Sequence, residues 1–381
     1  MIRSTFKKIA ASVLALAFVF SLFSCKAGKA KSGIDALPAE TLVAQVDGYD
    51  VRWDQFYYFA NYIVSSMISY ASYYKIDLTD WTAEEQLEGT GKSYQEYAID
   101  NAYSGLKWYI AIYQKALELG ITVTEELQTQ IDAEYKEMVN SYGTEESALA
   151  ALAEQGLVKS AFLWLLQAEI LYDAILEKQY GENYSGFPDD KTEQFIESND
   201  FLRAKHILLL TSENDVDFDE EKKAEVLEAT KAIIEDLKAY DGEDFDAYFS
   251  EIMAEKSEDP GSVAQPDGYV FTAGEMVDEF FNEAKSLGVG EFSAEPVKTT
   301  YGYHIVYRLP LLPDDSYTDS NNVTKTLRAR AAATELDEEL NDKCQLMTVE
   351  QKASGNKIKF EDVFVKPLLA EQEESSPTPA G

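Results

Sequence analysis

The two histidines of this chain, His206 and His304, are its clearest candidates for chemistry. Each lies in a run rich in β-branched and other aliphatic residues, so both are predicted to sit on strands. If the two strands are neighbours, the imidazoles can face each other and form a hydrogen-bonded pair. The alternative is that both are ordinary core histidines whose hydrogen bonds are satisfied locally.

A metallohydrolase that uses the same two histidines is another possibility, but the sequence offers little for it. It contains no His-Glu-Xaa-Xaa-His motif and no third histidine to complete a zinc-binding set. We therefore predict no metal site.

The segments around the histidines carry motifs that belong together. Residues 203–208 read Arg-Ala-Lys-His-Ile-Leu, and residues 301–306 read Tyr-Gly-Tyr-His-Ile-Val. Between them lie, in order, residues 256–259, 274–276, Phe280, 290–293 and 296–299. This set resembles the parvulin family of peptidyl-prolyl cis-trans isomerases, and the resemblance covers residues 201–310.

The resemblance implies that particular side chains help to rotate an Xaa-Pro peptide bond, without a cofactor. It implies that Asp259 lies beside the substrate carbonyl. It also implies that His206, Thr299 and His304 form a hydrogen-bonded array with Asp259, so these four are the catalytic positions. It also implies a proline-binding wall of Phe271, Met276 and Phe280. Met276 and Phe280 are four residues apart, which predicts that they share one helix face. Plain core packing is the alternative for both.

The chain departs from the family pattern between the two motifs. Where parvulins commonly read Gly-Gly-Asp-Leu-Gly-Phe-Phe, residues 265–271 read Gln-Pro-Asp-Gly-Tyr-Val-Phe. The leucine of the usual proline pocket is thereby replaced by Gly268, which leaves the shape of the pocket open. Residues 212–221 are acidic and contain no cluster of Lys or Arg that would hold a phosphate, so a phosphoserine-proline preference is not expected.

Strand and helix signals predict how these residues are held in place. Helices packed on a small antiparallel sheet make an α+β domain, and the resemblance implies the same fold. The expected strands are residues 201–210, 269–271, 294–298 and 303–309, and the expected helices are residues 221–240, 245–255 and 276–287.

The region before this domain, residues 41–200, is predicted to be an all-α domain. A hairpin signal at residues 42–51 opens it, and the expected helices are residues 53–74, 94–119, 125–142, 145–154, 158–180 and 191–199. The hairpin followed by a long helix resembles the PrsA and SurA class of secretory foldases. Tyrosines crowd more than one face of the first helix, which favours a surface for unfolded chain segments. Ordinary helix packing is the alternative.

The segment after the parvulin-like domain is also predicted from the foldase resemblance. Residues 311–370 are expected to pack back on the N-terminal domain, with a helix at residues 322–346 and an alternating strand at residues 358–365. Residues 371–381 are rich in Pro, Ser and Glu and are expected to be disordered.

Residues 1–24 have the order of a bacterial lipoprotein signal. Two lysines precede an apolar run over residues 9–23 that is short for a spanning helix. A small residue directly before Cys25 resembles a lipobox, which implies lipidation of Cys25, a tether over residues 25–40 and anchoring on the extracytoplasmic side of the cell membrane. An uncleaved anchor with an incidental cysteine is the alternative. With Cys25 lipidated, Cys344 has no partner for a disulfide.

The net charge of −36 and the pI near 4.3 argue against nucleic acid as a partner. They favour basic or neutral unfolded protein chains, although an acidic surface also serves solubility alone. We expect an anchored peptidyl-prolyl isomerase and foldase that assists secreted proteins. The alternative is a non-catalytic chaperone or binding lipoprotein that keeps the parvulin fold as a scaffold.

Overall fold

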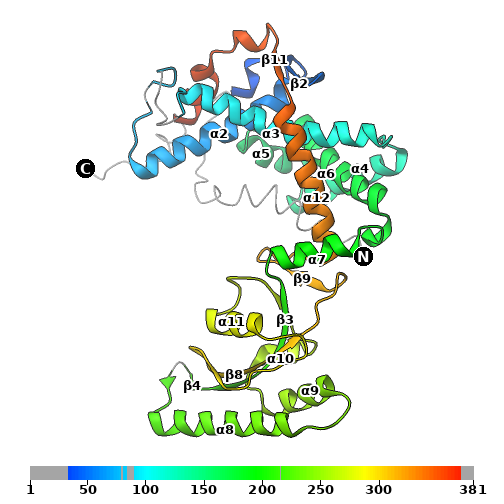
Figure 1. Ribbon diagram of the computed structural model, residues 1–381. Coiled ribbons are helices and arrows are strands. Elements are labelled where there is room, and N and C mark those ends of the chain that lie inside the picture. Colours follow the sequence, from blue (N-terminus) through cyan, green and yellow to red (C-terminus); the bar gives the residue numbers. More distant parts are fainter. Residues whose placement is uncertain (1–32, 79, 84–89, 215, 370–381) are drawn as a thin grey trace, which may run out of the picture. The chain divides into compact units, whose positions relative to one another are not determined.

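The computed structural model describes residues 33–78, 80–83, 90–214 and 216–369 (Figure 1). The chain folds into two compact units. Unit 1 contains the described residues up to Gly181 together with those from Glu335 onward, and unit 2 contains Glu182–Thr334. The predicted signal segment with Cys25 and the predicted tail at residues 371–381 lie outside the described residues.

Unit 2 is built on a four-stranded antiparallel sheet with the strand order β6-β3-β8-β7 (Figure 1). Its strands are β3 (Leu202–Leu210), β6 (Tyr269–Phe271), β7 (Val297–Lys298) and β8 (Gly302–Leu309). The central strands β3 and β8 pair with His206 opposite Val306 and Leu208 opposite His304. Because side chains two residues apart on a strand share a face, both histidines project from the same face of the sheet.

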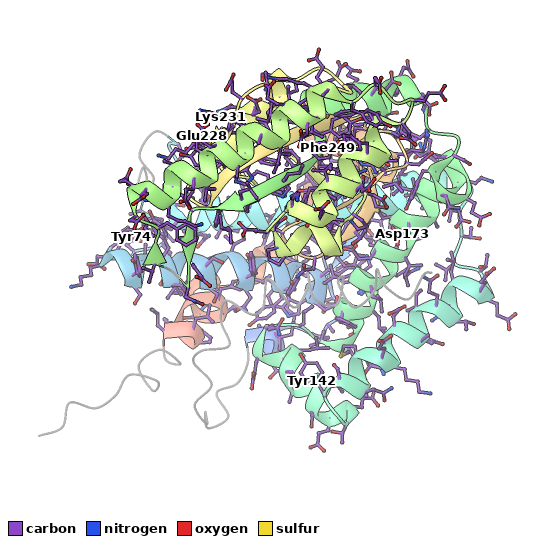
Figure 2. The ribbon with its side chains drawn as sticks, turned by 90° about the horizontal axis from the view of Figure 1, so that it is seen from below. Tyr74, Tyr142, Asp173, Glu228, Lys231 and Phe249 are labelled. Atoms are coloured by element: carbon purple, nitrogen blue, oxygen red, sulfur yellow. The ribbon has the colours of Figure 1, made fainter. Side chains whose placement is uncertain are left out.

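Two helices cover the face of the sheet that points away from the histidines. They are α8 (Glu220–Ala239) and α9 (Phe245–Lys256). The buried side chains on this side are Ile207, Ile233, Ile234, Leu237, Phe249, Met253, Ile305, Tyr307 and Leu309. Figure 2 labels Phe249 on α9, and Glu228 and Lys231 on the exposed side of α8, where their side chains form an ion pair at 2.8 Å.

The other face of the sheet carries the histidines and is covered by α11 (Asp278–Ser286). Its buried side chains are Leu202, Ala204, Phe271, Phe280, Phe281, Ala284 and Val306. Alternation along β3 therefore divides the two cores, since Ala204 packs with α11 while Ile207 packs with α8 and α9. Lys205 lies on the α9 side and is buried, and its amine is satisfied by Asp246 at 2.7 Å and Ser250 at 2.9 Å.

Shorter elements complete unit 2. They are η3 (Glu182–Tyr184), α7 (Asp189–Ser198), the hairpin of β4 (Ser212–Glu213) and β5 (Val216–Asp217), α10 (Pro260–Ala264), and the hairpin of β9 (Ser316–Thr318) and β10 (Thr324–Thr326). The helix predicted from residue 322 is α12 (Leu327–Leu346). Its predicted start is wrong because strand β10 occupies the residues directly before Leu327.

Unit 1 is mainly helical. Its helices are α2 (Trp53–Tyr74), α3 (Tyr94–Glu118), α4 (Glu125–Ser141), α5 (Glu145–Glu154) and α6 (Lys159–Tyr180), with short turns η2 (Gly33–Ala36) and η4 (Gly355–Lys357). Ser93 and Glu96 form a capping box at the start of α3, and the Thr124 and Thr144 side chains cap α4 and α5. A small antiparallel sheet joins β1 (Leu42–Val46), β2 (Tyr49–Arg52) and β11 (Val349–Gln351) in the order β11-β1-β2. The predicted combination of a helical N-terminal region with an α+β domain is confirmed.

Many side chains of α6 are buried within unit 1, among them those of Trp164, Leu165 and Leu171. Among the described residues, no single helix has both the length and the apolar composition needed to cross a membrane. The pair of α5 and α6 meets both criteria together, with a bend of 87° between the two helices.

The C-terminal segment differs from its prediction. Residues 358–365, predicted as a strand, contain the helical turn η5 (Glu361–Val365). Phe360 and Phe364 are both buried, with ring centroids 5.0 Å apart, and Phe364 also packs on Trp53. Their spacing of four residues fits one face of a helix as well as it fits strand alternation, and burial against α2 favours the helix.

Two predictions near the histidines are also wrong in detail. The strand expected at residues 294–298 is reduced to β7, which starts at Val297 because Pro296 lacks the amide hydrogen that a ladder needs. The helix expected from Met276 begins at Asp278, so Met276 and Phe280 do not share a helix face. Met276 still packs against the apolar cluster that contains Phe280.

Candidate active site

The register of β3 and β8 brings the two histidines into direct contact. The Nδ1 atoms of His206 and His304 lie 2.9 Å apart. Their rings are nearly parallel, with centroids 5.1 Å apart and an interplanar angle of 13°. Both side chains are largely buried, so this hydrogen bond is shielded from water.

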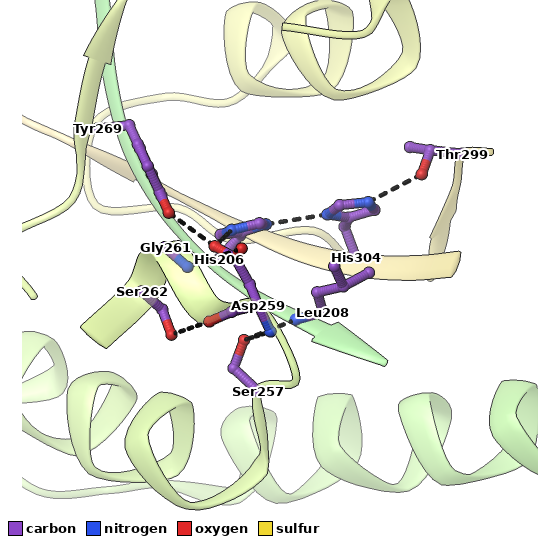
Figure 3. Close-up of polar contacts among 9 residues, drawn as sticks. All are labelled: His206, Leu208, Ser257, Asp259, Gly261, Ser262, Tyr269, Thr299 and His304. Atoms are coloured by element: carbon purple, nitrogen blue, oxygen red, sulfur yellow. Dashed lines mark hydrogen bonds and ion pairs between the residues drawn. The ribbon is translucent and has the colours of Figure 1, made fainter. Parts of the chain in front are cut away.

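Asp259 and Thr299 bind the outer nitrogens of this pair (Figure 3). The Nε2 of His206 lies 2.8 Å from Oδ2 of Asp259, and the Nε2 of His304 lies 2.9 Å from Oγ1 of Thr299. The four side chains predicted as catalytic therefore form one continuous hydrogen-bonded array.

Backbone contacts to β3 fix the position of Asp259. The segment after α9 runs beside this strand, where the Leu208 amide donates to Ser257 Oγ at 3.1 Å and the Glu258 amide donates to the Leu208 carbonyl at 2.8 Å. Asp259 then caps α10, since its Oδ1 accepts from the Gly261 amide at 3.0 Å. The Asp259 side chain is thus positioned by the contacts of the preceding segment with β3 and by its own hydrogen bond to the first turn of α10.

Burial lowers the pKa of both imidazoles. It disfavours the charged form of His304, and together with repulsion from His206 it lowers the pKa of His304 to about 3. Burial also lowers the pKa of His206 and outweighs the opposing effect of Asp259. Burial raises the pKa of Asp259, but hydrogen bonds from Tyr269, His206 and Gly261 outweigh it, so this pKa is lowered overall. At neutral pH the array therefore holds two neutral imidazoles and one carboxylate.

This charge state determines where the protons of the array lie. An ionised Asp259 can only accept, so His206 carries its proton on Nε2 and donates to the carboxylate. The bare Nδ1 of His206 accepts from the Nδ1–H of His304, whose Nε2 accepts from the Thr299 hydroxyl. Thr299 Oγ1 in turn accepts from the Tyr301 amide at 3.1 Å. Each donor in the array has an acceptor, and every hydrogen bond along it is donated in the direction of Asp259.

Apolar side chains lie against this array. The ring of Phe280 meets those of His206 and His304 edge-on, at centroid distances of 5.1 and 5.6 Å. Phe271 packs on Phe280 at 5.6 Å and is 1% exposed, whereas Met276 is only partly buried in the same cluster. The structure thus brings the apolar residues predicted for substrate binding together with the polar array. Their catalytic and binding roles stay predictions.

Sequence reasoning missed one member of the site, Tyr269. Its hydroxyl donates to Oδ2 of Asp259 at 2.7 Å, the oxygen that His206 also binds (Figure 3). The departure from the family pattern at residues 265–271 was the available signal, because it introduces a tyrosine where the pattern has glycine.

Comparison with a family model identifies residues 206–309 as a PPIC-type peptidyl-prolyl isomerase (rotamase) domain. The chain is 30% identical over 197 residues to the Campylobacter jejuni protein Cbf2, covering 48% of this chain and 66% of that relative, just under two thirds of its length. It is 30% identical over 280 residues to the foldase protein PrsA of Oceanobacillus iheyensis, covering 71% of this chain and 81% of the relative.

Solved structures are similar to the chain as well. One belongs to a study of SurA-like chaperones of Campylobacter jejuni, with 20% identity, coverage of 78% of this chain and 100% of the other, and a TM-score of 0.25. Another is PrsA of Bacillus subtilis, with 19% identity, coverage of 78% and 94%, and a TM-score of 0.22. The alignment with the Oceanobacillus protein extends well beyond the isomerase domain and spans most of both chains. The chain belongs to the PrsA foldase family.

Proposed function

We propose that this chain is a peptidyl-prolyl cis-trans isomerase and foldase that acts on newly secreted proteins while anchored to the extracytoplasmic side of the cell membrane. The observation that carries the isomerase part is the array from Thr299 to Asp259. It presents one carboxylate to an apolar cluster, and burial lowers the pKa of both imidazoles.

The chemistry of the reaction suits this arrangement. Rotation about an Xaa-Pro bond passes through a twisted state that loses amide resonance, at a barrier of roughly 18 to 20 kcal/mol. The planar amide carries more negative charge on its oxygen than the twisted form does. Asp259 beside that oxygen would therefore disfavour the planar form, and an apolar wall that includes Met276 would do the same by excluding water. The histidines would hold the carboxylate in place and would transfer no proton.

An isomerase assay tests this proposal directly. The full chain without its signal segment is expected to accelerate cis-trans exchange in several short Xaa-Pro peptides, which without an enzyme takes tens to hundreds of seconds. A Thr299→Val variant should retain part of this activity, because Thr299 binds His304 at the end of the array that lies away from Asp259. A folded wild-type chain that is inactive on every peptide would refute the isomerase role.

Exposed tyrosines of unit 1 favour a second activity, binding of unfolded chains. Tyr70, Tyr73 and Tyr74 at the end of α2 are 60%, 79% and 58% exposed, and their rings contact one another at 4.5 and 4.8 Å. Such rings offer apolar contact at little cost in side-chain entropy. If the chain were a chaperone without catalysis, it would suppress aggregation without isomerising peptides. Replacing Tyr73 and Tyr74 by serine would then weaken the suppression.

The membrane anchor rests on the sequence around Cys25, which lies outside the described residues. We expect Cys25→Ala to release the protein from the membrane or to leave an unprocessed precursor, because a lipidated cysteine would supply the buried chains that hold it there. Fractionation of cells that express each form measures this. A normally processed, membrane-bound Cys25→Ala protein would contradict lipidation. Cys344→Ala is the matched control and should remain membrane-bound.

A further inference from the structure

Tyr269 makes a contact with Asp259 that the family pattern does not provide. Its hydroxyl lies 2.7 Å from Oδ2 of Asp259, and its ring stands edge-on to His206 at a centroid distance of 5.6 Å. Oδ2 therefore receives two donors, one from β6 and one from β3, while Oδ1 receives the Gly261 amide. Three donors from three elements define the orientation of one carboxylate.

The space for this phenol depends on the absence of a side chain at Gly261. A Cβ atom at that position would lie 2.1 Å from the Tyr269 hydroxyl oxygen and 3.3 Å from both Asp259 oxygens. Heavy atoms do not approach so closely, so any residue with a Cβ atom at position 261 would displace the tyrosine. Gly261 thus contributes to the position of the carboxylate in two ways. Its amide donates to Oδ1, and its lack of a Cβ atom leaves space for the Tyr269 hydroxyl.

The backbone at Gly268 explains why the tyrosine is at position 269. Gly268 has φ of +90°, and a Cβ atom there would lie 2.8 Å from the Ala204 carbonyl oxygen. A leucine, which the family pattern has at this position, does not fit this backbone. The next residue, a glycine in the pattern, is Tyr269 here and packs against the cluster of Phe271 and Phe280. The large side chain at this part of the site therefore comes from position 269 in this chain, whereas in the family pattern it comes from the position of Gly268.

We propose that Tyr269 is a positioning residue for the isomerisation, which orients the Asp259 carboxylate and takes over the wall that the missing leucine would form. This inference rests on the proposed isomerase function. The groups that face Asp259 are the hydroxyl of Tyr269 on β6, the imidazole of His206 on β3 and the amide of Gly261 on α10, with His304 of β8 behind His206. Removing the hydroxyl leaves the carboxylate with one donor fewer and makes its charged form less favourable.

Tyr269→Phe is the direct test because it keeps the ring and removes only the hydroxyl. A hydrogen bond to a charged group is worth enough to move a titration by about one pH unit. We expect the acid limb of the pH profile of kcat/KM, and the carboxyl 13C titration of Asp259, to shift upward by that amount. The Asp259 signal is assigned by its loss in Asp259→Asn. Gly261→Ala should shift both curves in the same direction, because it displaces the hydroxyl.

Tyr303→Phe is the matched control, since Tyr303 is a half-buried tyrosine on β8 of the same sheet and is not part of the array. It should leave both titrations unchanged. A purely structural role for Tyr269 would lower the melting temperature and leave the Asp259 titration where it is, which would overturn the inference. The carboxyl titration does not depend on activity. An inactive wild type would refute the proposed function, whereas an unshifted Asp259 titration in an active enzyme would refute the role of Tyr269 alone.

Discussion

Asp259→Ala is expected to lower kcat/KM for an Xaa-Pro peptide at least about tenfold, which corresponds to about 1.4 kcal/mol of transition-state stabilisation. Asp259 carries the charge of the array at neutral pH, and its side chain is 18% exposed, more than that of His206 at 9%. It is therefore the polar member best placed to meet a substrate carbonyl. Because the change removes the charge and leaves the apolar wall intact, the loss should fall mainly on kcat.

The stability cost of this change must be separated from its catalytic effect. Asp259 caps α10, and losing a cap costs roughly 0.5 to 2 kcal/mol. Asp244 offers a matched control, because it caps α9 by accepting from the Ala247 amide at 3.0 Å and lies outside the array. Asp244→Ala should lower the melting temperature and leave kcat/KM unchanged. A folded Asp259→Ala protein with full activity would remove Asp259 from the site.

The central part of this site could be predicted because it depends on strand periodicity. His206 and His304 each lie in a strand-like run, and the pairing of β3 with β8 is enough to put both on one face. Asp259 is different, since it lies in the loop after α9, directly before the five-residue helix α10. Its place came from the motif spacing of the family and not from any local pattern.

Tyr269 could not be found by the same reasoning. Its contact requires the left-handed backbone of Gly268 and the close approach of the Tyr269 hydroxyl to Gly261, and both appear only in the folded structure. The strand predicted at residues 358–365, where the structure has η5, was wrong for a related reason. Phe360 and Phe364 satisfy both the strand and the helix periodicity, and only the packing of Phe364 against Trp53 and Phe56 of α2 distinguishes the two. Short segments take the conformation that their tertiary neighbours favour.

Unit 2 is expected to lose stability as the pH falls from 7 to 5, because its two histidines are buried in neutral form. The folded pKa of His304 is about 3, against 6.5 for the exposed group, and the pKa of His206 is also lowered. Below pH 6.5 the unfolded chain binds protons that the folded chain does not, so the free energy of unfolding decreases as the pH decreases. For His304 alone the loss between pH 7 and pH 5 is about 2 kcal/mol. The lowered pKa of Asp259 adds a further loss only below its ordinary range near 3.8.

Hydrogen exchange of β3 and β8 amides measures this loss within unit 2, after correction for the intrinsic exchange rates. Tryptophan fluorescence would not, since all four tryptophans belong to unit 1. With only two histidines in the chain, NMR titration of the imidazoles gives an independent measurement. The His304 ring should stay neutral in the folded protein down to about pH 5, and the His206 ring should titrate below its ordinary pKa of 6.5. His304→Gln should flatten the pH dependence of exchange, because a glutamine side chain does not titrate. An imidazole that titrates near 6.5 in folded protein would contradict the neutral array and the proton positions that follow from it.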